Sequence, residues 1–334
     1  MRIEDKINIV KTILKNKKVV IGFSGGADST LISYLASKVS KDVLAITINN
    51  NLMPTNFVEN TQKLAKLFNI KQEIVNINFY EDETFCKNDS ERCYYCRNLM
   101  YSQIENIAHK NDFDFICDGN NISDLVLNRP GILITYDKGF KTPLIEAKLT
   151  SKEIHEYLDL KKIPYFKSTT CLATRIPTDE EITCEKIEKI GVCEDYILTN
   201  TNCQIVKLRD LNEFSICEVD NINEILHESK YKQINDEFKR QGFNKVALNL
   251  SEIDDDEDII LDFEKGSFSY QLPYNINIEN TKKQLDNFQI TDEKIKIKNI
   301  TINKNGLING KNFKDYKSAL NAFMEILTKI KREL

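Results

Sequence analysis

The chain has 334 residues, of which 41% are hydrophobic and 29% charged, a size and composition that allow two or three domains with a sizeable core. The formal net charge of −5 argues against a globally basic protein, so we expect no nucleic-acid partner. The first residues lack a signal-peptide pattern, and no apolar run approaches about 18 residues, so we expect a cytoplasmic protein that does not enter a membrane.

A helix is expected at residues 4–16, and an alternation of strands and helices follows it. The expected strands are short, apolar and β-branched, at 18–23, 42–48, 71–77 and 113–117. The expected helices lie at 28–39, 56–69, 93–110 and 150–162. This order predicts an α/β domain over residues 1–168, with a mostly parallel sheet and helices on both faces.

The pattern changes in residues 169–250, which read as helix 184–199, strands 204–208 and 214–219, helix 221–241 and strand 244–250. That order predicts a small α+β domain. The acidic run at 254–258 is typical of a solvated linker, and a cation site is the alternative. Residues 251–334 are expected to form a C-terminal extension, rich in β-structure and closed by a helix at 314–332.

The loop Ser24-Gly25-Gly26-Ala27-Asp28-Ser29 lies between the first strand and the helix that follows it. Adjacent glycines let the backbone turn tightly and direct several N–H groups into one concavity, and the helix N-terminus adds a partial positive charge. The loop lacks the closing Gly-Lys-Ser/Thr of a Walker A motif and the G-x-G-x-x-G dinucleotide spacing. It predicts a pyrophosphate site, and a plain βα turn capped by Asp28 is the alternative.

Two cysteines at the start of the helix expected at 93–110 are spaced to share one metal centre. Cys93 and Cys96 stand at i and i+3, next to arginines and near a helix N-terminus, which lowers thiol pKa values. A redox pair, half of a zinc site, or two helical cysteines without a role are the alternatives. The nine cysteines of the chain, without a secretory signal, favour metal, redox or nucleophile roles over disulfides.

Cys171 lies in a polar loop four residues before Arg175. That setting suits an active thiolate or an iron ligand, and an idle loop cysteine is the alternative. Cys86 is a candidate for a fourth ligand.

The motifs SGGADS, RCYYCR, DGNNISDLVLNRPG, TPLIEAKLT, CLATRIP and GVCEDYIL follow one another in this order. Together they resemble the LarE family of PP-loop ATP pyrophosphatases, over roughly residues 5–250. The resemblance implies an ATP-dependent sulfur transferase that adenylates a carboxylate of pyridinium dicarboxylate mononucleotide and replaces oxygen with sulfur. In this family the product serves the nickel-pincer nucleotide cofactor, and a small C-terminal domain assembles a homo-oligomer.

One branch of the family gives up the sulfur of a single cysteine, and another holds a 4Fe–4S cluster on three cysteines. This chain resembles the cluster branch, which implies that Cys93, Cys96 and Cys171 are the cluster ligands. Cys171 also matches the position of the cysteine that the other branch sacrifices. The implied cofactors are ATP, Mg²⁺ and the cluster, with a separate sulfide donor. On this view the cluster carries sulfide.

The resemblance also implies roles for further side chains. Asp28 is expected near Mg²⁺, and Asp28 and Cys171 are the implied catalytic residues. The residues implied to bind ATP and Mg²⁺ are Ser24, Gly25, Gly26, Asp28, Ser29, Arg97 and Asp118. The implied substrate residues are Arg175, Glu194 and Arg209, with Lys207 as the alternative to Arg209. The chain departs from the family where Arg97 replaces a common Lys and where Gly119-Asn120-Asn121 replaces Gly-Thr-Asn.

Three other functions fit parts of this pattern. A tRNA thiolation enzyme uses the same loop and cluster chemistry, but it needs a basic surface or an RNA-binding module. An amidotransferase-type adenylating enzyme leaves the three cysteines without a role. A nucleotide-binding regulatory protein would not release pyrophosphate from ATP.

Overall fold

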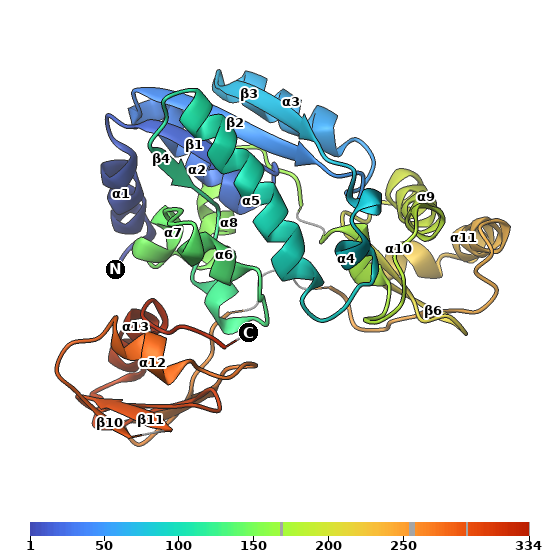
Figure 1. The fold of residues 1–334 in the computed structure, drawn as a ribbon. Coiled ribbons are helices and arrows are strands. Elements are labelled where there is room, and N and C mark those ends of the chain that lie inside the picture. The colour runs from blue at the N-terminus through green and yellow to red at the C-terminus, as the bar shows by residue number, and fades with distance from the viewer. Residues whose placement is uncertain (168–169, 254–257, 292, 334) are drawn as a thin grey trace.

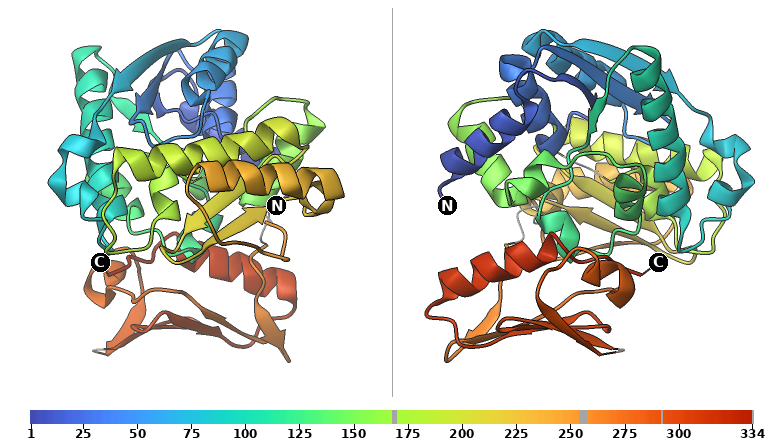
Figure 2. Two further views of the ribbon diagram at one scale, coloured as in Figure 1. Left: turned by 90° about the vertical axis from the view of Figure 1, so that its right-hand side faces the viewer. Right: turned by 60° about the vertical axis from the view of Figure 1, so that its left-hand side comes forward.

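The computed structural model describes residues 1–167, 170–253, 258–291 and 293–333. Within these ranges the chain forms an α/β region, a small α+β region and a β-rich C-terminal region, which lies below the α/β region in Figure 1. The views in Figure 2 show the C-terminal region against one end of the molecule from two further directions.

The α/β region contains the N-terminal elements of the chain. Its strands are β1 (Lys18–Gly22), β2 (Asp42–Asn49), β3 (Lys71–Asn76) and β4 (Phe115–Cys117). Its helices are α1 (Ile3–Leu14), α2 (Ala27–Val39), α3 (Phe57–Phe68), α4 (Glu83–Cys86), α5 (Arg92–Lys110), α6 (Ile132–Asp137), α7 (Pro143–Glu146) and α8 (Ser151–Leu160), with 3-10 turns η1 (Phe79–Glu81) and η2 (Ser123–Val126). The expected alternation of strands and helices is confirmed.

The sheet of this region is parallel, with strand order β3-β2-β1-β4. Its central strand β1 is apolar on both faces, as a strand between two helical layers must be. Val19 and Ile21 pack with α1, α2, α3 and α8 in one core, and Val20 packs with α5 in another. Figure 1 shows α5 crossing in front of the sheet, so the predicted fold class is confirmed.

The α+β region follows residue 170. Its elements are η3 (Leu172–Arg175), α9 (Cys184–Asn200), β5 (Val206–Asp210), β6 (Ser215–Val219), α10 (Asn223–Leu226), α11 (Glu228–Arg240) and β7 (Val246–Leu248). Strand β6 pairs antiparallel with β5 and parallel with β7. The single helix expected at 221–241 is wrong, because the backbone at His227 is extended (φ −65°, ψ 128°) and separates α10 from α11.

The C-terminal region is a sheet covered by helices. Its elements are β8 (Asp262–Glu264), β9 (Ser267–Gln271), α12 (Ile278–Lys282), β10 (Phe288–Thr291), β11 (Lys294–Ile297), β12 (Ile300–Asn303), β13 (Leu307–Gly310) and α13 (Tyr316–Leu327). The strands are ordered β10-β11-β12-β13-β9-β8, each antiparallel to its neighbour. The expected β-rich extension ending in a helix is confirmed, although α13 is shorter than predicted.

The domain boundaries expected near 168 and 250 stay predictions, and residues 168–169 lie outside the described ranges. Most of the acidic run expected to be a linker, 254–257, also lies outside them. Asp258, the last residue of that run, pairs with Lys152 at 2.7 Å. No helix in the described ranges is long and apolar enough to cross a lipid bilayer.

Candidate active site

The loop after β1 is held by its own serines. Gly25 has a φ of +76°, a conformation that favours glycine. Ser29 Oγ accepts from Ser24 N at 3.3 Å and donates to Gly26 O at 3.2 Å, while Phe166 N donates to Gly25 O at 3.0 Å. Gly26 is the N-cap of α2 without a side-chain cap, so amides of the first turn are left for another acceptor. Such a turn can bind phosphate.

The loop after β4 packs directly on this turn. A Cβ at Gly119 would lie 3.0 Å from the backbone N of Ser29 and 3.1 Å from the Cβ of Asp28. Only glycine therefore lets the two loops approach so closely. As expected for neighbouring parallel strands, β1 and β4 bring their carboxyl-end loops together.

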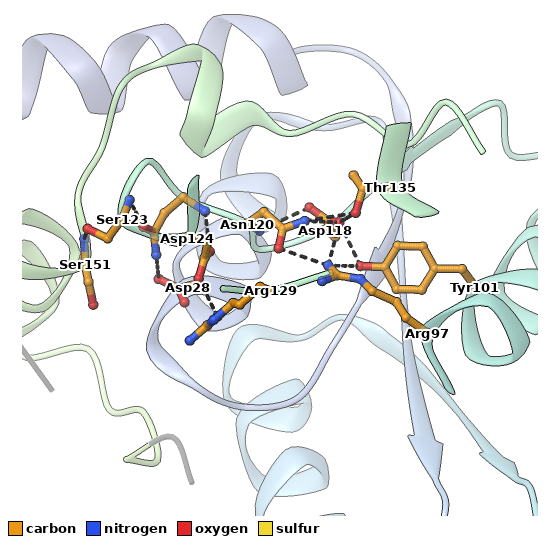
Figure 3. Close-up of polar contacts among 11 residues, drawn as sticks. Asp28, Arg97, Tyr101, Asp118, Asn120, Ser123, Asp124, Arg129, Thr135 and Ser151 are labelled. Carbon is orange, nitrogen blue, oxygen red and sulfur yellow. Dashed lines mark hydrogen bonds and ion pairs between the residues drawn. The ribbon is translucent and has the colours of Figure 1, made fainter. Parts of the chain in front are cut away.

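A pair of carboxylates faces this junction (Figure 3). Asn121 Nδ2 donates to Asp28 Oδ1 at 3.0 Å, and Asn121 N donates to Asp124 Oδ2 at 2.8 Å. Arg129 forms an ion pair with Asp124. Burial and the neighbouring Asp124 raise the pKa of Asp28 to about 7. A divalent cation would stabilise a buried carboxylate such as Asp28 that lies near a second carboxylate.

A second polar cluster, also drawn in Figure 3, surrounds Asp118. Its carboxylate, 3% exposed, accepts from Tyr101 Oη at 2.7 Å, Thr135 Oγ1 at 2.8 Å and Arg97 Nη2 at 3.1 Å. Arg97 Nη2 also donates to Asn120 Oδ1 at 2.9 Å. In this structure Arg97 and Asp118 bond to each other and to their neighbours, so they fix the β4 loop to α5. Their contact with ATP stays a prediction.

The same helix carries the cysteine pair. Cys93 and Cys96 lie in the first two turns of α5, and they and Cys171 are all partly buried. The lowered thiol pKa expected from the sequence is wrong for Cys96. Burial raises its pKa, the nearby thiols of Cys171 and Cys93 raise it further, and the charges of Arg92 and Arg97 only oppose that rise. Burial likewise raises the pKa of Cys171, and the charge of Arg92 opposes that rise. The three cysteines named from the sequence therefore lie close to one another.

Arg92 connects the two segments that bring these thiols together. Its Nη2 lies 3.4 Å from Cys93 Sγ, and its Nη1 donates to Ala173 O at 3.1 Å. Nη1 also contacts Asn88 Oδ1. One guanidinium thus bridges α5 and the turn that follows Cys171.

The fourth candidate ligand, Cys86, points elsewhere. Its Sγ lies 3.7 Å from the carbonyl oxygens of both Phe79 and Tyr80. Among the described residues, no group of three or more His, Cys, Asp or Glu side chains is arranged to hold a metal ion.

Comparisons with known proteins place this chain in a family. The NAD synthase family model matches residues 2–99, which include the loop after β1. An uncharacterized protein of Methanocaldococcus jannaschii is 31% identical over 244 residues, 73% of this chain and 93% of that protein. Pyridinium-3,5-bisthiocarboxylic acid mononucleotide synthase of Lactiplantibacillus plantarum is 25% identical over 256 residues, 73% of this chain and 90% of that enzyme.

The chain belongs to the LarE family. A tRNA-5-methyluridine(54) 2-sulfurtransferase of Thermotoga maritima is also similar, at 25% identity over 189 residues, 50% of this chain and 62% of that enzyme.

The arginine and glutamate that the LarE resemblance assigns to substrate form a buried ion pair. Arg175 and Glu194 are 1% and 2% exposed. Arg175 Nε donates to Glu194 Oε1 at 2.7 Å, and its Nη1 donates to Thr170 Oγ1 at 2.6 Å and Thr174 Oγ1 at 2.8 Å. Glu194 Oε1 also accepts from Leu208 N at 2.7 Å. The pair thus joins the Cys171 turn to α9 and β5.

The other two assigned residues lie on β5. Arg209 Nε donates to Glu218 Oε2 at 2.7 Å, and its Nη1 lies 3.5 Å from Thr174 O. Lys207 lies two residues earlier on the same strand. A substrate role for Arg175, Glu194, Arg209 or Lys207 stays a prediction.

Reasoning from the sequence missed the contacts that connect the predicted side chains. Asn121, Asp124 and Arg129 lie within the DGNNISDLVLNRPG motif, and Arg92 lies within RCYYCR. The motifs were visible, but hydrogen bonds between the β4 loop and Asp28, or between α5 and residue 173, become evident only in the fold.

Proposed function

We propose that the protein is an ATP-dependent sulfur transferase that forms AMP and pyrophosphate. Its substrate is a small carboxylated mononucleotide, pyridinium dicarboxylate mononucleotide, on the route to the nickel-pincer cofactor. The observation that carries the proposal is the proximity of Cys93 and Cys96, on α5, to Cys171, at the start of η3. Helix α5 also fixes the β4 loop beside the PP-loop. A PP-loop alone would support any adenylating enzyme.

In the first step a substrate carboxylate oxygen attacks the α-phosphorus of ATP. The new O–P bond forms as the bond from the α-phosphorus to the bridging oxygen breaks, and pyrophosphate leaves with the electron pair. The unpaired amides at the start of α2 and Ser24, Gly25, Gly26 and Ser29 stabilise that leaving group. Sulfide then attacks the acyl carbon of the adenylate and expels AMP.

Magnesium fits the carboxylates beside the PP-loop. Asp28 and Asp124 supply oxygen donors of the kind Mg²⁺ prefers. The pKa of Asp28 is raised first by burial and then by the charge of Asp124, and a bound cation would offset both effects. Asp28 therefore positions the metal, and Arg129 holds the Asp124 carboxylate.

The donor set also fits a 4Fe–4S cluster on Cys93, Cys96 and Cys171. Burial, and to a lesser degree the neighbouring thiols, raise the pKa values of Cys96 and Cys171, and bound cationic iron would stabilise their thiolates. A cluster with three cysteine ligands leaves one iron open, which supplies Lewis-acid binding of sulfide. Arg92 would then hold Cys93 and the turn after Cys171 in register.

Thiolation of tRNA is the second candidate, because a tRNA sulfurtransferase matches half of this chain. The formal net charge of −5 disfavours a phosphate backbone as partner. The mononucleotide synthase matches along 90% of its own length, which supports the small substrate.

The first test follows ATP. The purified chain with ATP, Mg²⁺ and the mononucleotide should release AMP and pyrophosphate, and Asp28→Asn should slow that release by about a hundredfold or more through lost metal positioning. Asp42→Asn is the matched control, because Asp42 lies at the opposite end of the sheet and pairs with Lys71. ADP as the main product would refute the proposal.

The second test follows iron. Anaerobic reconstitution should give about four irons per chain, the content of a 4Fe–4S cluster. Cys171→Ser should remove most of this iron, and Cys86→Ser should leave it unchanged. Iron retained by Cys171→Ser, or lost from Cys86→Ser, would refute the proposed ligand set. Added bulk tRNA should acquire no sulfur, and the mononucleotide should.

A further inference from the structure

The C-terminal region shares a hydrophobic core with the α/β region. Ile122, Leu125, Ile132 and Ile145 of the α/β region are buried in one cluster with apolar residues of the C-terminal sheet and of α13, including Phe323. Two ion pairs, Lys148–Glu325 and Lys152–Asp258, also cross between the regions. The two regions therefore pack as one body at this face.

The polar contacts at this interface are concentrated on one segment. Tyr274 Oη donates to the carbonyl of Leu125, and Arg332 Nη2 donates to Asn128 Oδ1 at 2.8 Å. Both acceptors belong to residues 121–131, which also contain Asp124 and Arg129. Tyr274 and Arg332 thus contact the same segment that Asn121 joins to Asp28. Figure 3 shows Asp124 and Arg129 of this segment beside Asp28.

The two side chains are fixed relative to each other. The guanidinium of Arg332 lies 4.7 Å from the ring centroid of Tyr274, and a β-bridge pairs Arg332 with Ile276. Lys331 lies over the ring of Tyr136 at 3.4 Å. The end of the chain is therefore anchored on the α/β region and on its own sheet.

One more observation ties Arg332 to the site. Its Nη1 is buried and has no hydrogen-bond partner among the described residues. A cavity of about 10 Å³, lined by Asp124, Tyr274 and Arg332 among others, adjoins it. Arg332 and Asp124 therefore line the same small cavity, next to the segment that joins Asp28.

We propose that the C-terminal region is part of the nucleotide site, and that Tyr274 and Arg332 are positioning residues that hold residues 121–131 against Asp28. The inference rests on the proposed use of ATP at the PP-loop. Without these two contacts residues 121–131 would no longer be held by the C-terminal region. Asp124 and Arg129 would then sample positions away from Asp28. ATP with Mg²⁺ would then bind more weakly while the PP-loop itself stayed intact.

The test compares Tyr274→Phe and Arg332→Gln with the parent chain and with Tyr316→Phe. Tyr316 is the matched control, because its hydroxyl accepts from Leu261 N at 3.3 Å, within the C-terminal region. Each test variant should raise the Kd of Mg-ATP, measured by calorimetry, by about fivefold, the effect of one lost hydrogen bond. Tyr316→Phe should leave that Kd unchanged, and Arg332→Lys should recover part of the loss.

Hydrogen exchange makes the test independent of the reaction. Amides of residues 121–131 should exchange faster in Tyr274→Phe and Arg332→Gln than in the parent, and not in Tyr316→Phe. Unchanged exchange there, or an equal loss of ATP affinity in Tyr316→Phe, would overturn the inference. A parent chain that binds ATP but releases no pyrophosphate would refute the proposed function alone, since Kd and exchange would still report on the two contacts.

Discussion

Arg92 is the side chain on which the meeting of the three thiols depends. It donates to Ala173 O at 3.1 Å and lies 3.4 Å from Cys93 Sγ. Arg92→Gln should speed the loss of iron to a chelator by about tenfold, because a charged hydrogen bond contributes about 1.5–3 kcal/mol. Iron released per minute from the reconstituted protein is the measurement.

The control for that experiment is Lys87→Gln. This substitution removes the positive charge of Lys87, five residues before Arg92. Among the described residues, the Lys87 side chain forms no hydrogen bond to a cysteine. The variant's rate of iron loss should equal that of the parent. Equal rates for Arg92→Gln and the parent would mean that Arg92 does not hold the cysteines in register.

The buried pair of Arg175 and Glu194 predicts a large effect on stability. Glu194→Gln leaves a guanidinium inside the protein without its counter-charge, and removing one partner of a buried pair costs about 3–5 kcal/mol. The free energy of unfolding from urea titration should fall by about that amount. Arg209→Gln, which breaks a pair with Arg209 40% exposed, should change it by less than about 1 kcal/mol. Equal losses of unfolding free energy in Glu194→Gln and Arg209→Gln would mean that the buried pair contributes no more to stability than an exposed pair.

Gly119 controls how closely two secondary-structure elements approach. Gly119→Ala would place a Cβ 3.0 Å from the backbone N of Ser29, and neither backbone can move without shifting the start of α2. We expect a loss of about 1–3 kcal/mol in stability from overpacking and about tenfold weaker ATP binding. Thermal unfolding and calorimetry measure the two effects.

Gly22→Ala is the matched control for Gly119→Ala. Gly22 ends β1, next to the same loop, and its added Cβ would meet the flexible end of Ile104 at 3.4 Å. ATP affinity should stay within about twofold of the parent, since ordinary van der Waals contact costs little. Parent-like ATP binding in Gly119→Ala would contradict the close approach.

The elements were predictable because local chemistry determines them. Apolar runs gave β1 to β4, and the glycine pair placed the phosphate loop between β1 and α2. The break at His227 was not predictable, since the residues around it favour a helix and only an extended backbone there divides α10 from α11. Ion pairs between distant residues were not predictable either: Arg175 and Glu194 were both named from the sequence, but nothing in it pairs them.

The shared core predicts that the α/β region depends on the C-terminal region. A chain ending at Ile253 would expose Ile122, Leu125, Ile132 and Ile145. Burial of such side chains contributes about 1.5–3 kcal/mol each, so the Tm should fall by about 10 °C or more. ATP affinity should fall with it. Scanning calorimetry and ATP titration of the shortened chain measure both.

A second shortened chain separates stability from support of the site. Polar residues at these four positions should restore solubility, because no apolar patch is then exposed. They should not restore ATP affinity, since Tyr274 and Arg332 are still missing. A shortened chain with the parent's Tm and ATP affinity would make the C-terminal region an independent appendage.

The docking of the C-terminal region also marks the limit of prediction from this sequence. Its β-rich pattern and final helix were readable from local periodicity. Its contacts with Leu125 and Asn128 were not, because they join residues about 150 to 200 positions apart and depend on how two finished regions meet.

The four apolar side chains beneath the C-terminal region carry an evolutionary consequence. Once an added domain covers such residues, polar side chains there are no longer selected, and mutations toward Ile and Leu accumulate without harm. Deleting the domain in one step would then expose an apolar, aggregation-prone surface. Loss of the domain would therefore require several earlier substitutions toward polar residues. The C-terminal region would then be retained whether or not it improves catalysis. Relatives that lack it should carry polar residues at the positions of Ile122, Leu125, Ile132 and Ile145.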